Sequence, residues 1–282
     1  MTILVTGAAL QKSLVTLADV KTAIAPGDSD DAFLTDLIIR ASRKIGTLTR
    51  RKFEREAVTE TLSGSGTTEL MTKFFPIVNI SEIRFDSSVV DADSYQINGE
   101  SGLLYRAERW AGSTPASFDI TVNPLPWQGN LDWALDYTSG FLLPTDDFVS
   151  ALIAADTTAK TFTLSSGTWP LLVAGDIFTL AGWVTATANN RIFTVVTRTD
   201  SVVTVSEAVT TSAEGDSITV TVQTLPEDLE ELCIEMVKGS FYARSRDGAL
   251  KSEKIGDWAA SWGTTSMSAD AKAIINEYKV MF

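Results

Sequence analysis

The chain has 282 residues, of which 44% are hydrophobic, so it is long enough to bury one large core or two ordinary ones. It has no histidine and a single cysteine, which excludes Ser-His and Cys-His nucleophile pairs, histidine-ligated metal sites and an intrachain disulfide. The formal net charge of −13 argues against sequence-specific DNA binding, because an acidic surface repels nucleic acid. No apolar run is long enough for a membrane-spanning helix, and the first residues do not resemble a secretory signal.

Two helices are predicted in the first fifty residues. Thr16 and Asp19 have the spacing of a capping box, and Pro26 should end the short helix that follows them. A second helix is predicted over residues 31–49, where apolar side chains recur every three or four positions. Its apolar stripe consists of Phe33, Leu34, Leu37, Ile38, Ala41, Ile45 and Leu48.

Strands are predicted between residues 53 and 141, because the apolar period changes from that of a helix to that of a sheet. Glycine-rich turns at residues 64–66 and 98–102 predict two hairpins. The first predicted hairpin consists of strands 58–62 and 67–71, and the second consists of strands 95–97 and 103–105. Three further strands are predicted over 77–85, 118–122 and 133–137.

Residues 142–224 differ in composition from the rest of the chain. They are rich in Thr, Val and Ala, and their positive residues are Lys160, Arg191 and Arg198. Five short strands separated by turns predict a small sandwich or barrel. The sequence LPTDD at 143–147 resembles LPEDL at 225–229, as expected if a module had been spliced into a loop whose two ends lie close together.

Helix returns at Pro226, a favourable first helical residue, and the helix is expected to end near residues 247–248. An extended arm is predicted over 255–262, and Ser268 should cap a last helix over about 269–280. The predicted fold class is α+β: a helical body with a β-strand subdomain, interrupted by an inserted all-β sandwich or barrel-like module. The body comprises residues 14–141 and 225–282, and the module comprises residues 142–224.

One basic cluster stands out in the acidic chain. Its members are Arg43, Lys44, Arg50, Arg51, Lys52 and Arg55. Cations suit the C-terminal end of a helix, which is one interpretation of the cluster. The other is a contact with DNA phosphates or with an acidic neighbouring subunit. Cys233 lies on the apolar stripe of the helix after Pro226, so a buried structural role is expected rather than a nucleophile.

Aromatic residues are concentrated near the C-terminus. Ile255, Trp258, Trp262, Tyr278 and Phe282 lie in a segment too short to bury them by itself. Aromatic side chains are enriched in interface cores. They must therefore pack either on the body of the same chain or on another chain.

The order of these features resembles the head-to-tail adaptor, or head completion, proteins of tailed bacteriophages. The resemblance covers roughly residues 14–141 and 225–282. The segments that carry it are DAFLTDLIIRAS at 31–42, TRRKF at 49–53, ISEIRF at 80–85, YTSGF at 137–141, LPEDL at 225–229 and SEKIGDW at 252–258.

The resemblance implies a structural virion protein at the head–tail interface, assembled in the host cytoplasm. It implies a ring of commonly twelve copies beneath the portal, which continues the DNA channel and offers a docking surface to a tail or tail-completion protein. Packaged DNA would pass non-specifically, and the C-terminal arm, residues 251–282, would reach towards the portal. Ile255, Trp258, Trp262, Tyr278 and Phe282 would then lie at the portal or subunit interface. The resemblance implies no catalytic residues, cofactor or metal.

Two alternatives remain open from the sequence. The β module could make the chain a host-recognition or carbohydrate-binding protein, with Trp169 and Trp183 as exposed platforms. Both tryptophans could instead fill the core of the module. A carboxylate-dependent hydrolase is the other alternative, although no constellation of acidic residues stands out.

Overall fold

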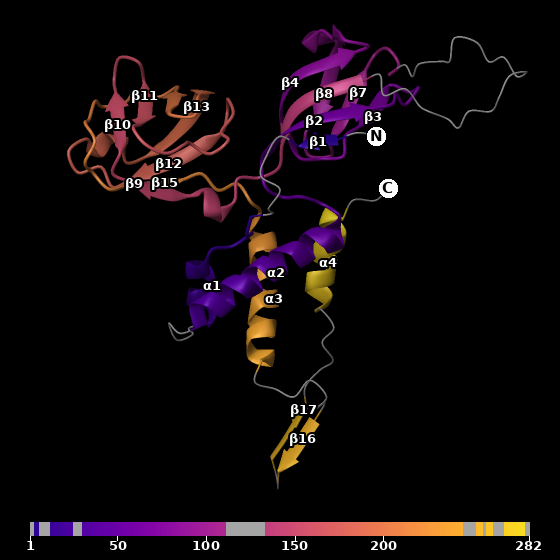
Figure 1. Ribbon diagram of the computed structural model, residues 1–282, viewed down its shortest axis with the longest axis vertical. Coiled ribbons are helices and arrows are strands. Elements are labelled where there is room, and N and C mark those ends of the chain that lie inside the picture. The colour runs from indigo at the N-terminus through magenta and orange to yellow at the C-terminus, as the bar shows by residue number, and fades with distance from the viewer. Residues whose placement is uncertain are drawn as a thin grey trace, which may run out of the picture.

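The computed structural model describes residues 12–24, 30–110, 133–244 and 268–279, together with the backbone of 3–5, 252–255 and 258–261. Figure 1 shows an elongated molecule: two β-rich parts lie at one end, four helices lie in the middle, and a two-stranded hairpin lies at the other end. Each of the first three parts has its own hydrophobic cluster.

The helical part is built from segments far apart in the sequence. Its helices are α1 (Leu17–Ile24), α2 (Asp31–Thr49), α3 (Glu227–Ala243) and α4 (Ala269–Tyr278). The predicted stripe of α2 is buried against the other helices. The capping box is confirmed, because the Thr16 backbone N–H donates to Asp19 and the Asp19 N–H donates to the Thr16 hydroxyl. The Ser268 hydroxyl likewise accepts from the Ala271 N–H at 3.0 Å, as predicted for the last helix.

Two antiparallel sheets built from residues 3–5, 56–106 and 133–139 share one hydrophobic cluster. The five-stranded sheet has the order β1 (Ile3–Val5), β2 (Glu56–Leu62), β8 (Trp133–Ser139), β4 (Ile77–Phe85) and β5 (Ser88–Val89). The three-stranded sheet has the order β3 (Glu69–Met71), β7 (Leu103–Arg106) and β6 (Tyr95–Asn98), and a 3₁₀ turn (Ala92–Ser94) precedes β6. Trp133 stacks edge-on against Trp110 between the sheets, and both side chains are fully buried.

The first predicted hairpin is wrong, whereas the second is confirmed. β2 pairs with β1 and β8, and β3 pairs with β7, so the strands on either side of Gly66 belong to different sheets. The cause lies in Trp110: its backbone bonds both Gly66 and Thr67, and its buried ring draws this turn away from β2. β6 and β7 form the second hairpin as predicted. The strand predicted over 118–122 lies outside the described residues.

The prediction of a helical body is also wrong, because strands make up most of the regular structure. The strands between residues 56 and 139 do not pack as a layer on the helices. Their buried side chains, among them Ile83, Trp133 and Leu135, form a separate cluster from that of the helices. β-branched and aromatic side chains alternating along β2, β4 and β8 pack on one another, which gives this part a core of its own.

Residues 142–224, the predicted insertion, form one seven-stranded antiparallel sheet that curls around an aromatic core. Its order is β10 (Ile153–Asp156), β11 (Thr161–Leu164), β14 (Val202–Val205), β13 (Ile192–Arg198), β12 (Ile177–Ala181), β15 (Ile218–Thr221) and β9 (Phe148–Ser150). A bulge between Val195 and Thr197 bends β13 and so curves the sheet. The five predicted strands are present, and β9 and β10 were missed. Two 3₁₀ turns (Pro144–Asp146 and Thr187–Asn189) complete the regular structure of this region.

The two ends of the inserted region lie side by side. The Leu142 carbonyl accepts from the Thr224 and Leu225 N–H groups at 2.9 and 3.1 Å, and the Leu142 N–H donates to the Thr224 hydroxyl. Just before this point, Gly140 has a φ of +94°, and a Cβ there would lie 2.3 Å from the Glu54 carbonyl oxygen. Glycine is therefore required where the chain leaves β8 and passes the segment between α2 and β2.

Candidate interaction surfaces

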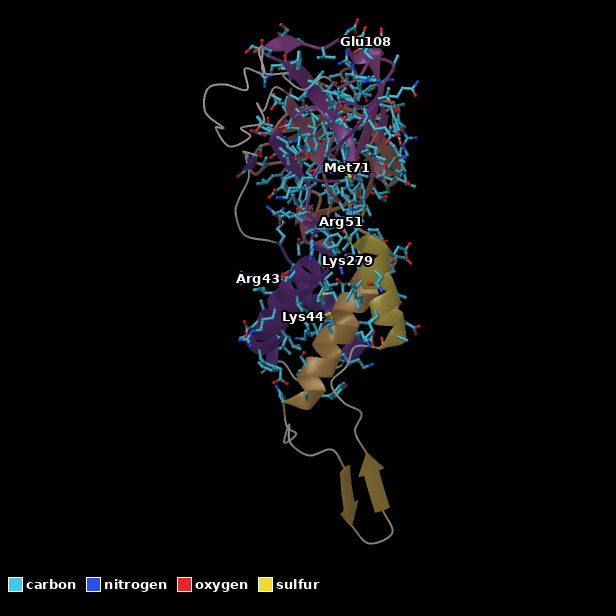
Figure 2. The ribbon with its side chains drawn as sticks, turned by 90° about the vertical axis from the view of Figure 1, so that its right-hand side faces the viewer. Arg43, Lys44, Arg51, Met71, Glu108 and Lys279 are labelled. Carbon is cyan, nitrogen blue, oxygen red and sulfur yellow. The ribbon has the colours of Figure 1, made fainter. Side chains whose placement is uncertain are left out.

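The basic cluster occupies the C-terminal half of α2 and the segment that leads into β2. Arg43, Lys44 and Arg50 are exposed and make no ion pair within the described part of the chain. In Figure 2, Arg43 and Lys44 are labelled along α2, and Arg51 lies above them where the helices meet the sheets. Arg50 adopts a left-handed backbone (φ 57°) and its N–H bonds the Gly46 carbonyl, which ends the helix.

The other three members of the cluster are engaged within the chain. The Arg51 guanidinium lies 4.1 Å from the centre of the Phe75 ring and donates to the Phe75 carbonyl at 2.7 Å. Burial lowers the pKa of Arg51 to about 10, which leaves it charged at neutral pH. Burial disfavours the charged form of Lys52, but its ion pairs with Glu54 and Glu56 outweigh that effect and raise its pKa.

Arg55 makes a different kind of contact, because it reaches the inserted region. Its guanidinium forms an ion pair with Asp176, and the two side chains are only 4% and 9% exposed. The same guanidinium faces the carbonyl oxygens of Leu171, at 3.5 Å, and Gly140, at 3.4 Å. The sequence placed Arg55 in the basic cluster but gave no signal for its partner, which is 121 residues away.

A shallow basic pocket joins part of the cluster to the segment after β3. It is lined by Arg50, Arg51, Lys52, Lys73, Phe74 and Phe75. Lys73 was not predicted as a site residue, because nothing in its local sequence links it to α2. Arg50, Arg51 and Lys52, which were predicted as contact residues, thus line one surface together with Lys73. Lys73 is distant from them in sequence and reaches this surface through the tertiary fold.

A buried carboxyl group lies beneath this pocket. Glu60 is fully buried, and it accepts hydrogen bonds from the Tyr137 hydroxyl at 2.7 Å and from the Lys73 N–H at 3.1 Å. Burial raises the pKa of Glu60, and these hydrogen bonds offset the effect only in part. Its second oxygen has no hydrogen-bond partner among the residues that the structure describes, so a protonated side chain suits this position.

Acidic side chains gather on α3 and at the base of the inserted region. Glu227, Glu231 and Glu235 are exposed on α3 and, among the described residues, form no ion pair. Glu230 is half-buried on the same helix, and its pKa is raised to about 7, first by burial and then by the carboxylates of Asp19, Glu227 and Asp147. Acidic charge is therefore concentrated at this end of α3. The i, i+4, i+8 spacing of the exposed glutamates is visible in the sequence, but it was not singled out as a surface.

The predicted interface residues of the C-terminal arm lie in different places. Ile255 and Trp258 are paired with each other in the hairpin of β16 (Ser252–Ile255) and β17 (Trp258–Ser261). Tyr278 packs edge-on against Phe53 of its own chain and donates to Asp228 at 3.1 Å. Trp262 and Phe282 lie outside the described residues. Figure 1 shows the hairpin beyond the helices, while α4 lies beside them.

The tryptophans considered as carbohydrate platforms are buried. Trp169 is 1% and Trp183 is 2% exposed, and both belong to the core of the seven-stranded sheet. Trp169 stacks on Phe148 and Phe178. The proposal that these two rings present a glycan-binding face is therefore wrong.

The described residues contain no group of three or more Cys, Asp or Glu side chains placed to hold a metal ion. None of the helices in this part of the chain has both the length and the apolar character needed to cross a membrane. Cys233 is fully buried, faces the Ser42 hydroxyl at 3.6 Å, and has a pKa raised by burial to about 11.

No protein-family model matches the chain, and no curated protein matches it. Among solved structures, the chain is similar to chains in "Virion of native gene transfer agent (GTA) particle" (10% identity, TM-score 0.35), "Neck of empty GTA particle computed with C6 symmetry" (12%, 0.36) and "Neck of native GTA particle computed with C12 symmetry" (9%, 0.36). Each similarity covers 100% of this chain and 97% of the other chain. At these TM-scores the similarity carries no conclusion about function.

Proposed function

We propose that the chain is a structural virion protein that forms a ring-shaped adaptor between the portal and the tail. The observation that carries the proposal is the elongated arrangement in Figure 1, with a projecting hairpin at one end and the β-rich parts at the other. An adaptor must contact a different partner at each end, and this arrangement separates two such surfaces. The sequence resemblance to head-to-tail adaptors supplies the identity of the partners: the portal on one side and a tail protein on the other.

The proposal divides the chain into a body, residues 14–141 and 225–282, and an inserted module, residues 142–224. Support comes from the cores, because the cluster of the seven-stranded sheet contains only residues from Leu142 to Val222. The hydrogen bonds between Leu142 and Thr224 hold the two ends of the module together, as an insertion into a loop requires.

Within the C-terminal arm, we assign the portal contact to the β16–β17 hairpin, with Ile255 and Trp258 as the contact residues. The helix that follows the hairpin buries Ala271 and Ile275 against α2 and α3, so it belongs to the body. Packaged DNA would pass through a ring whose net negative charge disfavours tight binding.

Electron microscopy of portal-containing particles from the same virus tests this function. We expect a ring of copies of this chain directly below the portal, with the hairpin directed towards it. A chain that never joins such particles would overturn the adaptor proposal.

A variant tests the hairpin separately. Replacing residues 252–261 by a Gly/Ser segment of equal length should leave the helices folded but prevent incorporation into the particles. The control replaces the five largely exposed residues 213–217 of the inserted module by a Gly/Ser segment of equal length and should still be incorporated. Normal incorporation of the hairpin variant would refute the assigned portal contact and leave the ring to be judged by imaging.

A further inference from the structure

Two exposed faces of the helical part carry opposite charges. On α2, residues Leu34, Leu37, Ile38, Ala41 and Ile45 are buried, which leaves Arg43 and Lys44 on the solvent side, and Arg50 is exposed at the residue that ends the helix. On α3, residues Leu229, Leu232, Cys233 and Val237 are buried, which leaves Glu227, Glu231 and Glu235 on the solvent side. We call these the cationic face of α2 and the anionic face of α3.

The two faces cannot meet within one chain. α2 and α3 pack through their buried stripes, which form a single cluster. The exposed side of each helix therefore points away from its neighbour. Neither set of charges has an ion-pair partner among the described residues, so both remain available to another molecule.

The dimensions of the faces match. With a helical rise of 1.5 Å per residue, the cationic charges from Arg43 to Arg50 span about 10 Å. By the same rise, the anionic charges from Glu227 to Glu235 span about 12 Å. Arg43 and Lys44 lie within one turn of each other, Arg50 lies about two turns farther on, and the exposed Lys238 follows Glu235 by one turn, so one helix laid along the other could form about two ion pairs.

We infer that the cationic face of α2 in one copy docks on the anionic face of α3 in the next copy. A ring needs two different, complementary patches on every subunit, because each contact is made head to tail. In a chain of net charge −13, copies repel one another unless the contact places cations against carboxylates. These two faces provide that arrangement, whereas DNA would use only the cationic face and would leave the glutamates without a role. The inference rests on the proposed ring and names its subunit contact.

Reciprocal charge reversal tests this contact. In the first variant, Arg43, Lys44 and Arg50 are changed to Glu, and in the second, Glu227, Glu231 and Glu235 are changed to Lys. Self-association of each variant alone, measured by sedimentation velocity at low salt, should weaken by at least about tenfold, because the attractive pairs become repulsive. Mixing the two variants should restore association, since every contact in an alternating ring is again complementary.

The control changes three exposed glutamates elsewhere, Glu100, Glu108 and Glu214, to Lys, and it should associate like the wild type. Because all the changed side chains are exposed, each variant should keep the circular dichroism spectrum of the wild type. Single variants that associate normally, or a mixture that does not recover, would overturn the inferred contact. A wild-type chain that stays monomeric at high concentration would also overturn the inferred contact between α2 and α3 of neighbouring copies. The adaptor function itself is judged separately by imaging the particles.

Discussion

The ion pair between Arg55 and Asp176 is a buried polar link between residues 142–224 and the rest of the chain, and its loss should be costly. Both side chains are at least 91% buried, so solvent screens the pair very little. Asp176 also accepts a hydrogen bond from the Val173 N–H at 2.8 Å, which closes a turn in the module. Changing Asp176 to Ala leaves the Arg55 charge buried without a counter-charge. We expect the free energy of unfolding to fall by about 3–5 kcal/mol.

A double-mutant cycle separates the pair from its surroundings. Arg55→Met should also be destabilising, because it leaves the Asp176 carboxylate buried and unpaired. The double variant, Arg55→Met with Asp176→Leu, should lose less stability than the sum of the single changes, by about 1.5 kcal/mol or more. Urea unfolding followed by circular dichroism and tryptophan fluorescence measures each value.

The matched control is the exposed pair of Asp36 and Arg40 on α2, whose side chains are 50% and 72% exposed. Asp36→Ala should change the free energy of unfolding by no more than about 1 kcal/mol. A loss below about 1 kcal/mol for Asp176→Ala, or strict additivity in the cycle, would show that the pair does not fasten the module to the body.

Other regions of the chain give further predictions. Burial raises the pKa of Glu60 above its unfolded value of about 4.5, so the folded state binds that proton more tightly. The stabilising contribution of the Glu60 proton is therefore present below pH 4.5 and is lost as the pH rises through the folded pKa. Glu60→Gln should flatten this part of the curve of unfolding free energy against pH. An unchanged curve would contradict a raised pKa at Glu60. Trp183→Phe should cost less stability than Trp169→Phe, because the Trp183 ring N–H has no partner in the described part of the chain, whereas that of Trp169 donates to the Ser201 carbonyl; equal losses in urea unfolding would refute this reasoning. Cys233, with a pKa raised to about 11, should react with a thiol reagent at pH 8 about 100-fold or more faster in urea than in buffer, and fast labelling of the native protein would contradict its burial. Deleting residues 146–223 should leave a soluble body with the circular dichroism of its helices, and aggregation of that variant would mean that the module is part of the body's core.

Local signals in the sequence predicted the helices well. The capping box at Thr16, the apolar stripe of α2 and the serine cap of α4 each act within four residues, and the structure shows all three. Strand positions were also predicted from alternation, for example Ile77–Phe85. Such signals are readable because the interacting groups are close in sequence.

Pairing between distant segments was less predictable. The first hairpin was wrong because the position of Trp110, more than forty residues beyond the turn at Gly66, decides which sheet β3 joins. The composition of the basic pocket was also not predictable from local sequence, since the tertiary fold brings Lys73 next to Arg50, Arg51 and Lys52. Arg55 shows the limit most directly: the sequence marks it as basic, but its function as a link depends on an aspartate 121 residues away.

The three hydrophobic clusters of the chain are largely separate, which limits the contacts that can fix their relative orientation. Among the described residues of 142–224, Leu143 is buried in the cluster of the helices, whereas the other buried apolar side chains form the cluster of the seven-stranded sheet, so hydrophobic packing joins the two parts only at the chain crossing. The orientation of residues 142–224 then depends on Leu143, on the paired chain ends at Leu142 and Thr224, and on polar links that include the Lys12–Asp146 pair and the buried pair of Arg55 and Asp176. A buried ion pair often adds little net stability over apolar residues of similar size, yet it tolerates only one geometry. If Asp176→Ala proves costly while the double variant does not, the pair serves mainly to specify how the module sits on the body, which is the property that a symmetric ring of identical copies requires.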